Sequence, residues 1–133
     1  MVRIALYQAR SGIDPVANSA ALVAAVETAA AGGAAMLFTP EMSGLLDSNR
    51  ERAKSSIRTE EDDEVLRNVR AAAKPSGIWV HLGSLALQGS GDRFVNRVSD
   101  PAGITLGQRA TTGQSTREQA IGLLLAAHAA GLR

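Results

Sequence analysis

The pattern of apolar positions at the start of the chain predicts a strand, a helix and a second strand. Apolar side chains alternate over residues 2–7, which is the period of a strand with one face toward a core. Residues 15–31 repeat them at helical spacing, and Asp14 before Pro15 is typical of an N-cap followed by a first-turn proline. Residues 35–38 are apolar on both faces, as in a buried strand. Because short turns join these elements, we expect parallel strands with a right-handed crossover, which is the α/β class.

Glycines and capping residues mark the ends of the helices. Gly32 and Gly33 can take the left-handed conformation that ends the first helix. Thr59 and Asp62 have the spacing of a capping box, so a second helix is expected to begin there. Acidic residues fill its start and basic residues its later turns, which matches the helix dipole. This helix should stop at residues 75–77.

Three further apolar runs predict strands, at residues 78–82, 94–98 and 104–106. A glycine-rich loop is expected between the first two of them. The last two flank the turn at residues 100–103, and such a short connection cannot make a parallel crossover. They should therefore form an antiparallel hairpin. The polar sequence of residues 108–116 is typical of turns.

Composition and charge restrict the function classes. A chain of 133 residues with 45% hydrophobic residues suits one domain over residues 1–133, in which residues 108–133 form a divergent, helical C-terminal tail. A net charge of +1 gives no electrostatic reason to expect nucleic acid or an anionic membrane as partner. The absence of cysteine excludes disulfides, a thiolate zinc site and a cysteine nucleophile. No export signal precedes the first strand, so we expect a cytoplasmic protein.

Glu41 is the leading candidate for chemistry, because it follows the predicted strand at residues 35–38. Ligands of open α/β sheets collect at the carboxyl ends of strands, and a glutamate there can be partly desolvated and act as a general base. The alternative interpretation is a surface carboxylate that caps a loop.

The other polar candidates favour structural roles. His81 lies in an apolar run and His128 on the apolar side of the last predicted helix, and neither has a second ligand at metal-binding spacing, so we expect no metal and no cofactor. Ser84 lacks the second glycine of a nucleophile elbow, and the glycines around it do not form a phosphate loop. Asn96 is expected to pair strands or anchor a loop.

Several motifs in order resemble the nitrilase, or carbon-nitrogen hydrolase, superfamily. The opening is similar in residues 3–8, in Asn18 and in residues 30–42, which end in Phe-Thr-Pro-Glu-Met. Further on, the strand that ends in Gly83 and Ser84 resembles another family element. The Phe-x-Asn strand at residues 94–97 and the Asp-x-x-Gly turn at residues 100–103 do so as well. The resemblance covers about residues 2–107.

This resemblance implies the N-terminal half of an α-β-β-α sandwich, with a mixed sheet and helices packed on one side. It also implies hydrolysis of a non-peptide carbon-nitrogen bond in an amide or nitrile by a Glu, Lys and Cys triad. The family's general base falls on Glu41. Its lysine segment is expected directly after the hairpin, but no lysine follows Lys74, and its cysteine belongs to the second half of the fold.

Three functional hypotheses follow. The chain is a truncated hydrolase, inactive alone, with an open sheet edge and an apolar face that is normally covered. Alternatively, it is a non-catalytic partner, as a homo-oligomer or in association with an intact relative. The third possibility is an unrelated small α/β binding module, for which all strands would be parallel with helices on both faces of the sheet.

Overall fold

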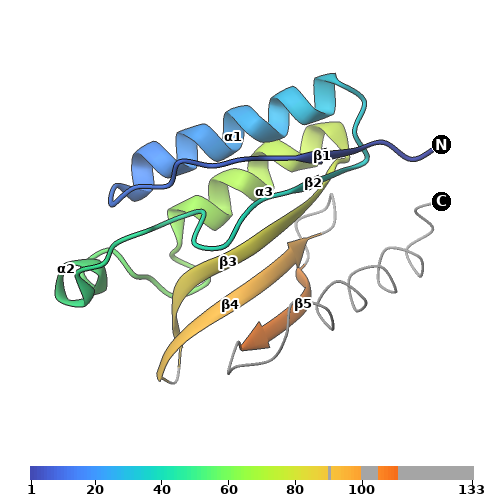
Figure 1. The fold of residues 1–133 in the computed structure, drawn as a ribbon. Helices are drawn as coiled ribbons and strands as arrows, with labels where there is room; N and C mark the ends of the chain where they lie inside the picture. The colour runs from blue at the N-terminus through green and yellow to red at the C-terminus, as the bar shows by residue number, and fades with distance from the viewer. Residues whose placement is uncertain (90, 100–104, 111–133) are drawn as a thin grey trace.

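A computed structural model describes residues 1–89, 91–99 and 105–110, and its elements form one sheet with two long helices (Figure 1). In chain order the elements are β1 (Ile4–Leu6), α1 (Pro15–Ala31), β2 (Met36–Phe38), α2 (Arg50–Lys54), α3 (Glu64–Ser76), β3 (Trp79–Gly89), β4 (Gly91–Ser99) and β5 (Thr105–Ala110). None of the described helices is both long and apolar enough to cross a bilayer. The predicted tail helix and His128 lie outside the described residues.

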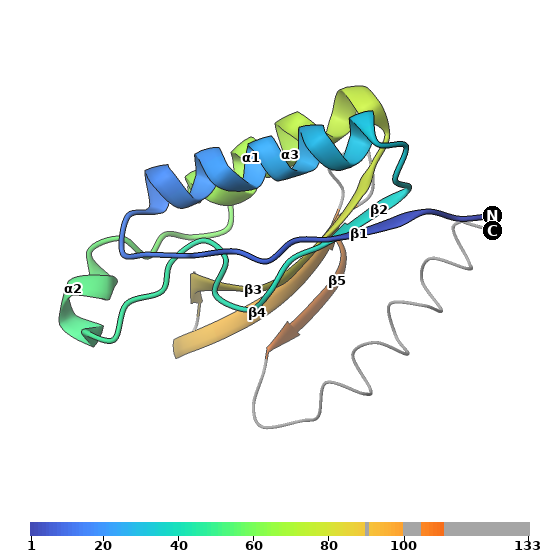
Figure 2. The ribbon, with the colours of Figure 1, turned by 45° about the horizontal axis from the view of Figure 1, so that its top comes forward.

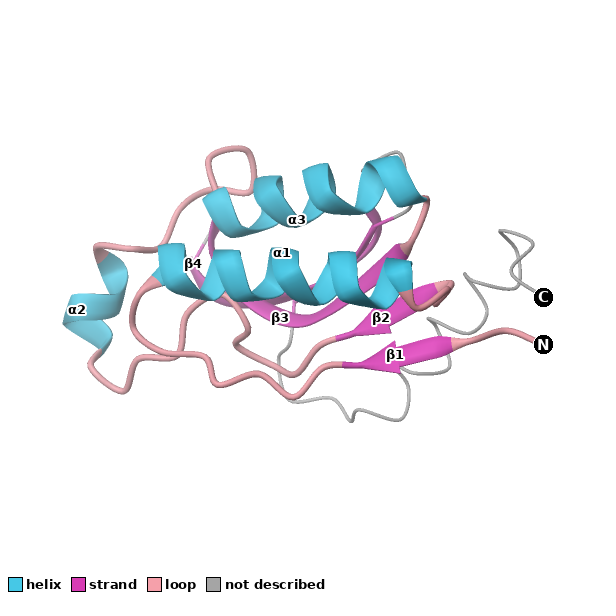
Figure 3. Ribbon diagram, turned by 90° about the horizontal axis from the view of Figure 1, so that it is seen from above, coloured by secondary structure: helices cyan, strands magenta, loops and turns pink. Residues whose placement is uncertain are grey.

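The sheet is mixed, as expected. Its strand order is β1-β2-β3-β4-β5, and β1, β2 and β3 are parallel while β4 is antiparallel to both of its neighbours. Helices α1 and α3 lie next to each other on one face of β1, β2 and β3 (Figures 2 and 3). The predicted parallel pairing of the first two strands and the predicted antiparallel pairing of the last two are therefore confirmed.

The first helix has the predicted bounds, and its caps explain them. The Asp14 carboxylate accepts a hydrogen bond from the amide of Val16 (2.9 Å), and Pro15 opens the helix. Of the two glycines that follow, only Gly33 adopts the left-handed conformation, with φ of 74°. Gly32 has φ of −76° and continues the turn.

The predicted capping box at Thr59 is wrong, because the helix begins one turn later. Asp63 is the N-cap of α3, and its carboxylate accepts a hydrogen bond from the amide of Leu66 (2.7 Å). The Thr59 hydroxyl bonds to the Asp62 side chain (3.1 Å) in the segment before the helix. Burial raises the pKa of the Asp63 carboxyl group, and the amide of Leu66 opposes that shift. Gly77, with φ of 70°, ends the helix as predicted.

The glycine-rich loop expected after residue 82 is instead the second half of β3. Its backbone pairs with β4 in an antiparallel ladder that runs to the Gly89–Gly91 pair, with an irregularity between Leu82 and Leu85. Pairing with a neighbouring strand thus overrides the weak strand propensity of glycine. Likewise, residues 108–110 belong to β5 rather than to a turn, and Asn96 lies opposite Arg109 in the register of β4 and β5.

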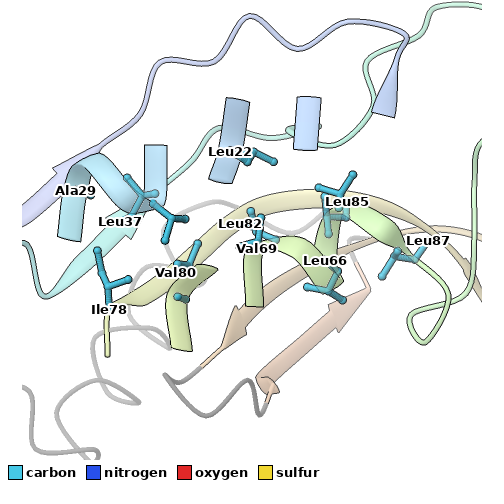
Figure 4. Close-up of a cluster of buried hydrophobic side chains, with 13 residues drawn as sticks. Leu22, Ala29, Leu37, Leu66, Val69, Ile78, Val80, Leu82, Leu85 and Leu87 are labelled. Atoms are coloured by element: carbon cyan, nitrogen blue, oxygen red, sulfur yellow. The ribbon is translucent and has the colours of Figure 1, made fainter. Parts of the chain in front are cut away.

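The core lies between the two helices and the sheet (Figure 4). Helix α1 contributes Leu22 and Val26, which are essentially inaccessible to solvent. These side chains belong to one cluster of thirteen, whose other members are Ala29, Leu37, Val65, Leu66, Val69, Ala73, Ile78, Val80, Leu82, Leu85 and Leu87. Burial of this apolar area is the main favourable contribution to folding.

On the opposite face, the sheet carries apolar side chains that become more exposed toward β1. The register places Ile4, Met36 and Trp79 in one row. Met36 and Trp79 are buried, whereas Ile4 is 55% exposed and Leu6 is 78% exposed. On β1, the smaller Ala5 and the amphipathic Tyr7 pack toward the helices instead.

We expect the two faces to respond differently to loss of a leucine side chain. Leu22→Ala should lower the free energy of unfolding by about 2–5 kcal/mol, because it leaves a cavity under α1. Leu6→Ala removes the same atoms from an exposed position and should change it by about 0.5 kcal/mol or less. Urea unfolding at low protein concentration would measure both. Equal losses would contradict the placement of the core.

His81 should make stability depend on pH. Burial lowers the pKa of its imidazole below the ordinary value of 6.5, so the unfolded chain binds a proton at a pH where the folded chain does not. The free energy of unfolding should therefore fall as the pH decreases through 6.5 toward the folded pKa. His81→Gln should reduce the difference between urea unfolding at about pH 8 and about pH 5.5. The comparison of the two proteins cancels the contributions of carboxyl groups, and an unchanged difference would refute the role of His81.

Candidate active site

Glu41 lies just beyond the carboxyl end of β2, in the loop of residues 39–44. Strands β1 and β2 end side by side at this edge, level with His81 of β3, which continues to Gly89. The amide of Tyr7 donates to the carbonyl of Phe38 (2.9 Å), and the amide of Thr39 donates to the carbonyl of His81 (3.0 Å). The βαβ topology therefore brings Glu41 to the sheet edge at which α/β proteins bind ligands.

Hydroxyl groups within the loop hold its turn. The Thr39 and Ser43 hydroxyls are 2.9 Å apart, and Ser43 also donates to the carbonyl of Pro40. Both side chains are buried. Buried hydroxyls are costly unless they are hydrogen-bonded, and here they bond to each other and to the loop backbone.

Strand β3 holds the loop through two hydrogen bonds. The hydroxyl of Ser84 accepts a hydrogen bond from the amide of Met42 (2.8 Å), and the amide of Gly83 approaches the Thr39 hydroxyl at 3.4 Å. At Gly83, a Cβ atom would lie only 2.5 Å from the carbonyl carbon of Pro40, so only glycine allows this approach.

Asn18 ties the same loop to the segment that follows β1. Its side chain is 7% exposed. It donates to the carbonyl of Gly44 (2.9 Å) and to that of Gly12 (2.8 Å), and it accepts from the amide of Gly12 (2.9 Å). Ser11 adds a bond to the carbonyl of Ser43 (3.3 Å). The asparagine in α1 is thus a support of the candidate site.

The carboxylate of Glu41 is the available reactive group of this loop. It is exposed, and it has neither a hydrogen bond nor an ion pair within the part of the chain that the structure describes. The side chains of the described residues therefore do not desolvate Glu41. A carboxylate in this state can accept a proton from a group brought within about 3 Å.

The remaining triad members have no counterpart at this edge. The sequence has no cysteine, and its two lysines lie on helices: Lys54 on α2, where it pairs with Glu51 (3.0 Å), and Lys74 in the last turn of α3. Within the described residues, no group of three His, Asp or Glu side chains could hold a metal ion.

The other candidates take structural positions. His81 packs its ring against Phe38, with centroids 5.5 Å apart. Ser84 uses its hydroxyl to accept the amide of Met42, and Gly83 lies within β3. The sequence analysis considered Ser84 as a nucleophile and as the end of a family-like strand, and it missed the role of this residue as a support of the loop. The signal was present, since two small residues interrupt an apolar strand at the point where the Glu41 loop crosses it.

Comparison with known proteins gives one consistent family. The carbon-nitrogen hydrolase family matches residues 3–102. Among solved structures, the chain is similar to the C. elegans NitFhit protein, with 21% identity and a TM-score of 0.73 over 86% of this chain and 30% of that one. It is also similar to an amidase from Nesterenkonia sp., with 25% identity and a TM-score of 0.68 over 90% of this chain and 46% of that one. No curated protein matches the sequence significantly.

These findings exclude the unrelated binding module among our hypotheses. Its signature was an all-parallel sheet with helices on both faces, whereas the sheet is mixed and α1 and α3 share one face (Figure 2). The similar structures have the α-β-β-α sandwich fold, and the chain spans less than half the length of each structure compared above. The family match covers most of the chain, from the first strand to the hairpin turn. This chain belongs to the carbon-nitrogen hydrolase family.

Proposed function

We propose that this chain is the base-bearing N-terminal part of a hydrolase that acts on non-peptide carbon-nitrogen bonds, of the amidase or nitrilase type. The observation that carries the proposal is the position of Glu41. It lies just beyond the carboxyl end of β2, on a loop that is bonded to Asn18 of α1 and to Ser84 of β3, within the region that matches the family. A location in the cytoplasm remains a prediction from the sequence.

The proposed chemistry needs a thiol that this chain does not contain. In the family mechanism, the glutamate takes the proton of the cysteine, and the thiolate attacks the carbonyl carbon of the amide. The carbon-nitrogen bond breaks as the amide nitrogen takes this proton from the glutamate and leaves as ammonia, and water then hydrolyses the thioester. A serine or threonine would need its own activating base to replace the thiolate. The chain alone is therefore inactive, and Glu41 functions when cysteine- and lysine-bearing segments complete the site.

Small aliphatic amides are the substrate class to test first. A variant of the similar Nesterenkonia amidase is in complex with butyramide, and another shows addition of acrylamide at its active-site cysteine. Butyramide is therefore a reasonable probe for this chain.

The purified chain should release no ammonia from butyramide above the blank. When it is combined with a cysteine- and lysine-bearing C-terminal segment of a related amidase, hydrolysis should appear. Glu41→Gln should reduce that rate by at least about 100-fold, the scale of general-base catalysis, whereas Glu51→Gln on α2 should retain it. Hydrolysis by the chain alone that Glu41→Gln abolishes would overturn the proposal, as would a complemented enzyme that tolerates this change.

A second candidate function is that of a non-catalytic partner. The observation that favours it is an apolar strip formed by Ile4 and Leu6 of β1 and by Val2 just before it, which are all exposed. Apolar side chains grouped on a sheet face away from the helices are typical of an interaction surface. Since α1 and α3 cover only the other face, a second copy of this chain or an intact relative could pack on this strip.

Sedimentation would test this association. We expect the chain to form a larger species, alone or when mixed with a full-length relative, and Leu6→Asp should shift it toward monomer. Leu46→Asp, which changes a leucine that is 53% exposed in the loop before α2, is the matched control and should have no effect. A stable monomer in both experiments would count against the partner function.

A further inference from the structure

Ser84 is a buried polar side chain that the proposed chemistry does not use. It is 4% exposed and lies on β3, where the pairing with β4 is irregular between Leu82 and Leu85. Its hydroxyl accepts the amide of Met42 across 42 residues of chain. A buried serine in an apolar strand needs such a partner, because an unpaired hydroxyl there would lose its hydrogen bonds to water.

This hydrogen bond acts on the peptide unit directly after Glu41. The amide of Met42 and the carbonyl of Glu41 belong to one planar peptide group. A hydrogen bond to that amide therefore fixes the orientation of the peptide group that follows Glu41. Met42 has φ of 55°, a left-handed backbone conformation that residues other than glycine adopt infrequently. The backbone holds this conformation because surrounding contacts enforce it.

Gly83 supports the peptide unit directly before Glu41. A Cβ atom at this position would lie 2.6 Å from the carbonyl oxygen of Pro40 and 2.7 Å from the amide nitrogen of Glu41. Two consecutive residues of β3 thus contact the backbone on the two sides of the glutamate. The side chain of Glu41 is itself exposed, so its direction depends on these backbone contacts.

We infer that Ser84 is a positioning residue for Glu41, acting through the amide of Met42, and that Gly83 provides the close approach that this bond requires. The inference rests on the proposed role of Glu41 as general base, although it concerns only the geometry of the loop. Ser84 is not a nucleophile in this arrangement, since its hydroxyl is committed to the loop backbone.

Nuclear magnetic resonance of the whole chain can test the inference without turnover. Ser84→Ala should speed hydrogen exchange of the Met42 amide about three- to tenfold, the scale of one lost hydrogen bond, while exchange in the core of β2 stays unchanged. The residual dipolar couplings of Glu41 should change with it, which a loss of general stability would not cause. Ser84→Thr, which keeps the hydroxyl, should restore both. Ser76→Ala removes a side-chain bond to the backbone in α3 and should leave Met42 and Glu41 unaffected.

Gly83→Ala provides a second route to the same result. It keeps the Ser84 hydroxyl but forces the loop away from β3, so the Met42 amide and Glu41 should change as in Ser84→Ala. The inference is overturned if Glu41 keeps its couplings in Ser84→Ala, or if exchange of Met42 rises only in parallel with the core. Because no substrate is involved, these results are independent of whether the complemented enzyme hydrolyses butyramide.

Discussion

The packing of α1 and α3 on one face of the sheet is the interaction on which the rest of the structure depends. Leu22 and Val26 of α1, with the apolar side chains of α3, bury the inner positions of β2 and β3 (Figure 4). This burial holds β1, β2 and β3 in parallel alignment, so that β1 and β2 end together at one edge while β3 continues beyond them. Glu41 occupies that edge because of where β2 ends. The hydrophobic core therefore decides the place of the candidate base.

The same packing leaves part of the other face of the sheet exposed. Because α1 and α3 both lie on one face of the sheet, they leave Ile4 and Leu6 exposed on the other face of β1 (Figure 2). In the α-β-β-α sandwich of the similar structures, a second sheet packs against the first. The chain spans less than half of the length of those structures that were compared, and its exposed strip fits a surface that a further layer would cover. The absent cysteine and the exposed strip thus lead to the same proposal, in which the functional unit contains more than this chain.

Polar interactions hold the loop around Glu41 in place at the end of β2. The loop around Glu41 contains buried hydroxyls and amides that bond to Asn18, to Ser84 and to one another. Each bond contributes modestly to stability, but together they restrict the backbone of this short turn to few conformations. Because the side chain of Glu41 is exposed, its direction depends on the backbone of this loop, which is what its proposed role as a general base would need.

The sequence by itself determined the βαβ start, the ends of α1, the antiparallel hairpin and the position of Glu41 after a buried strand. These features depend on local periodicity, caps and turn residues, which act over a few positions. Only the tertiary structure decided that α3 begins at Asp63 rather than at Thr59, and that β3 continues through Gly83 to pair with β4. It also decided which face of β1 is buried and which residues support Glu41. Those outcomes depend on contacts between segments about 40 residues apart, such as Met42 with Ser84, and such contacts leave no periodic signal in the chain.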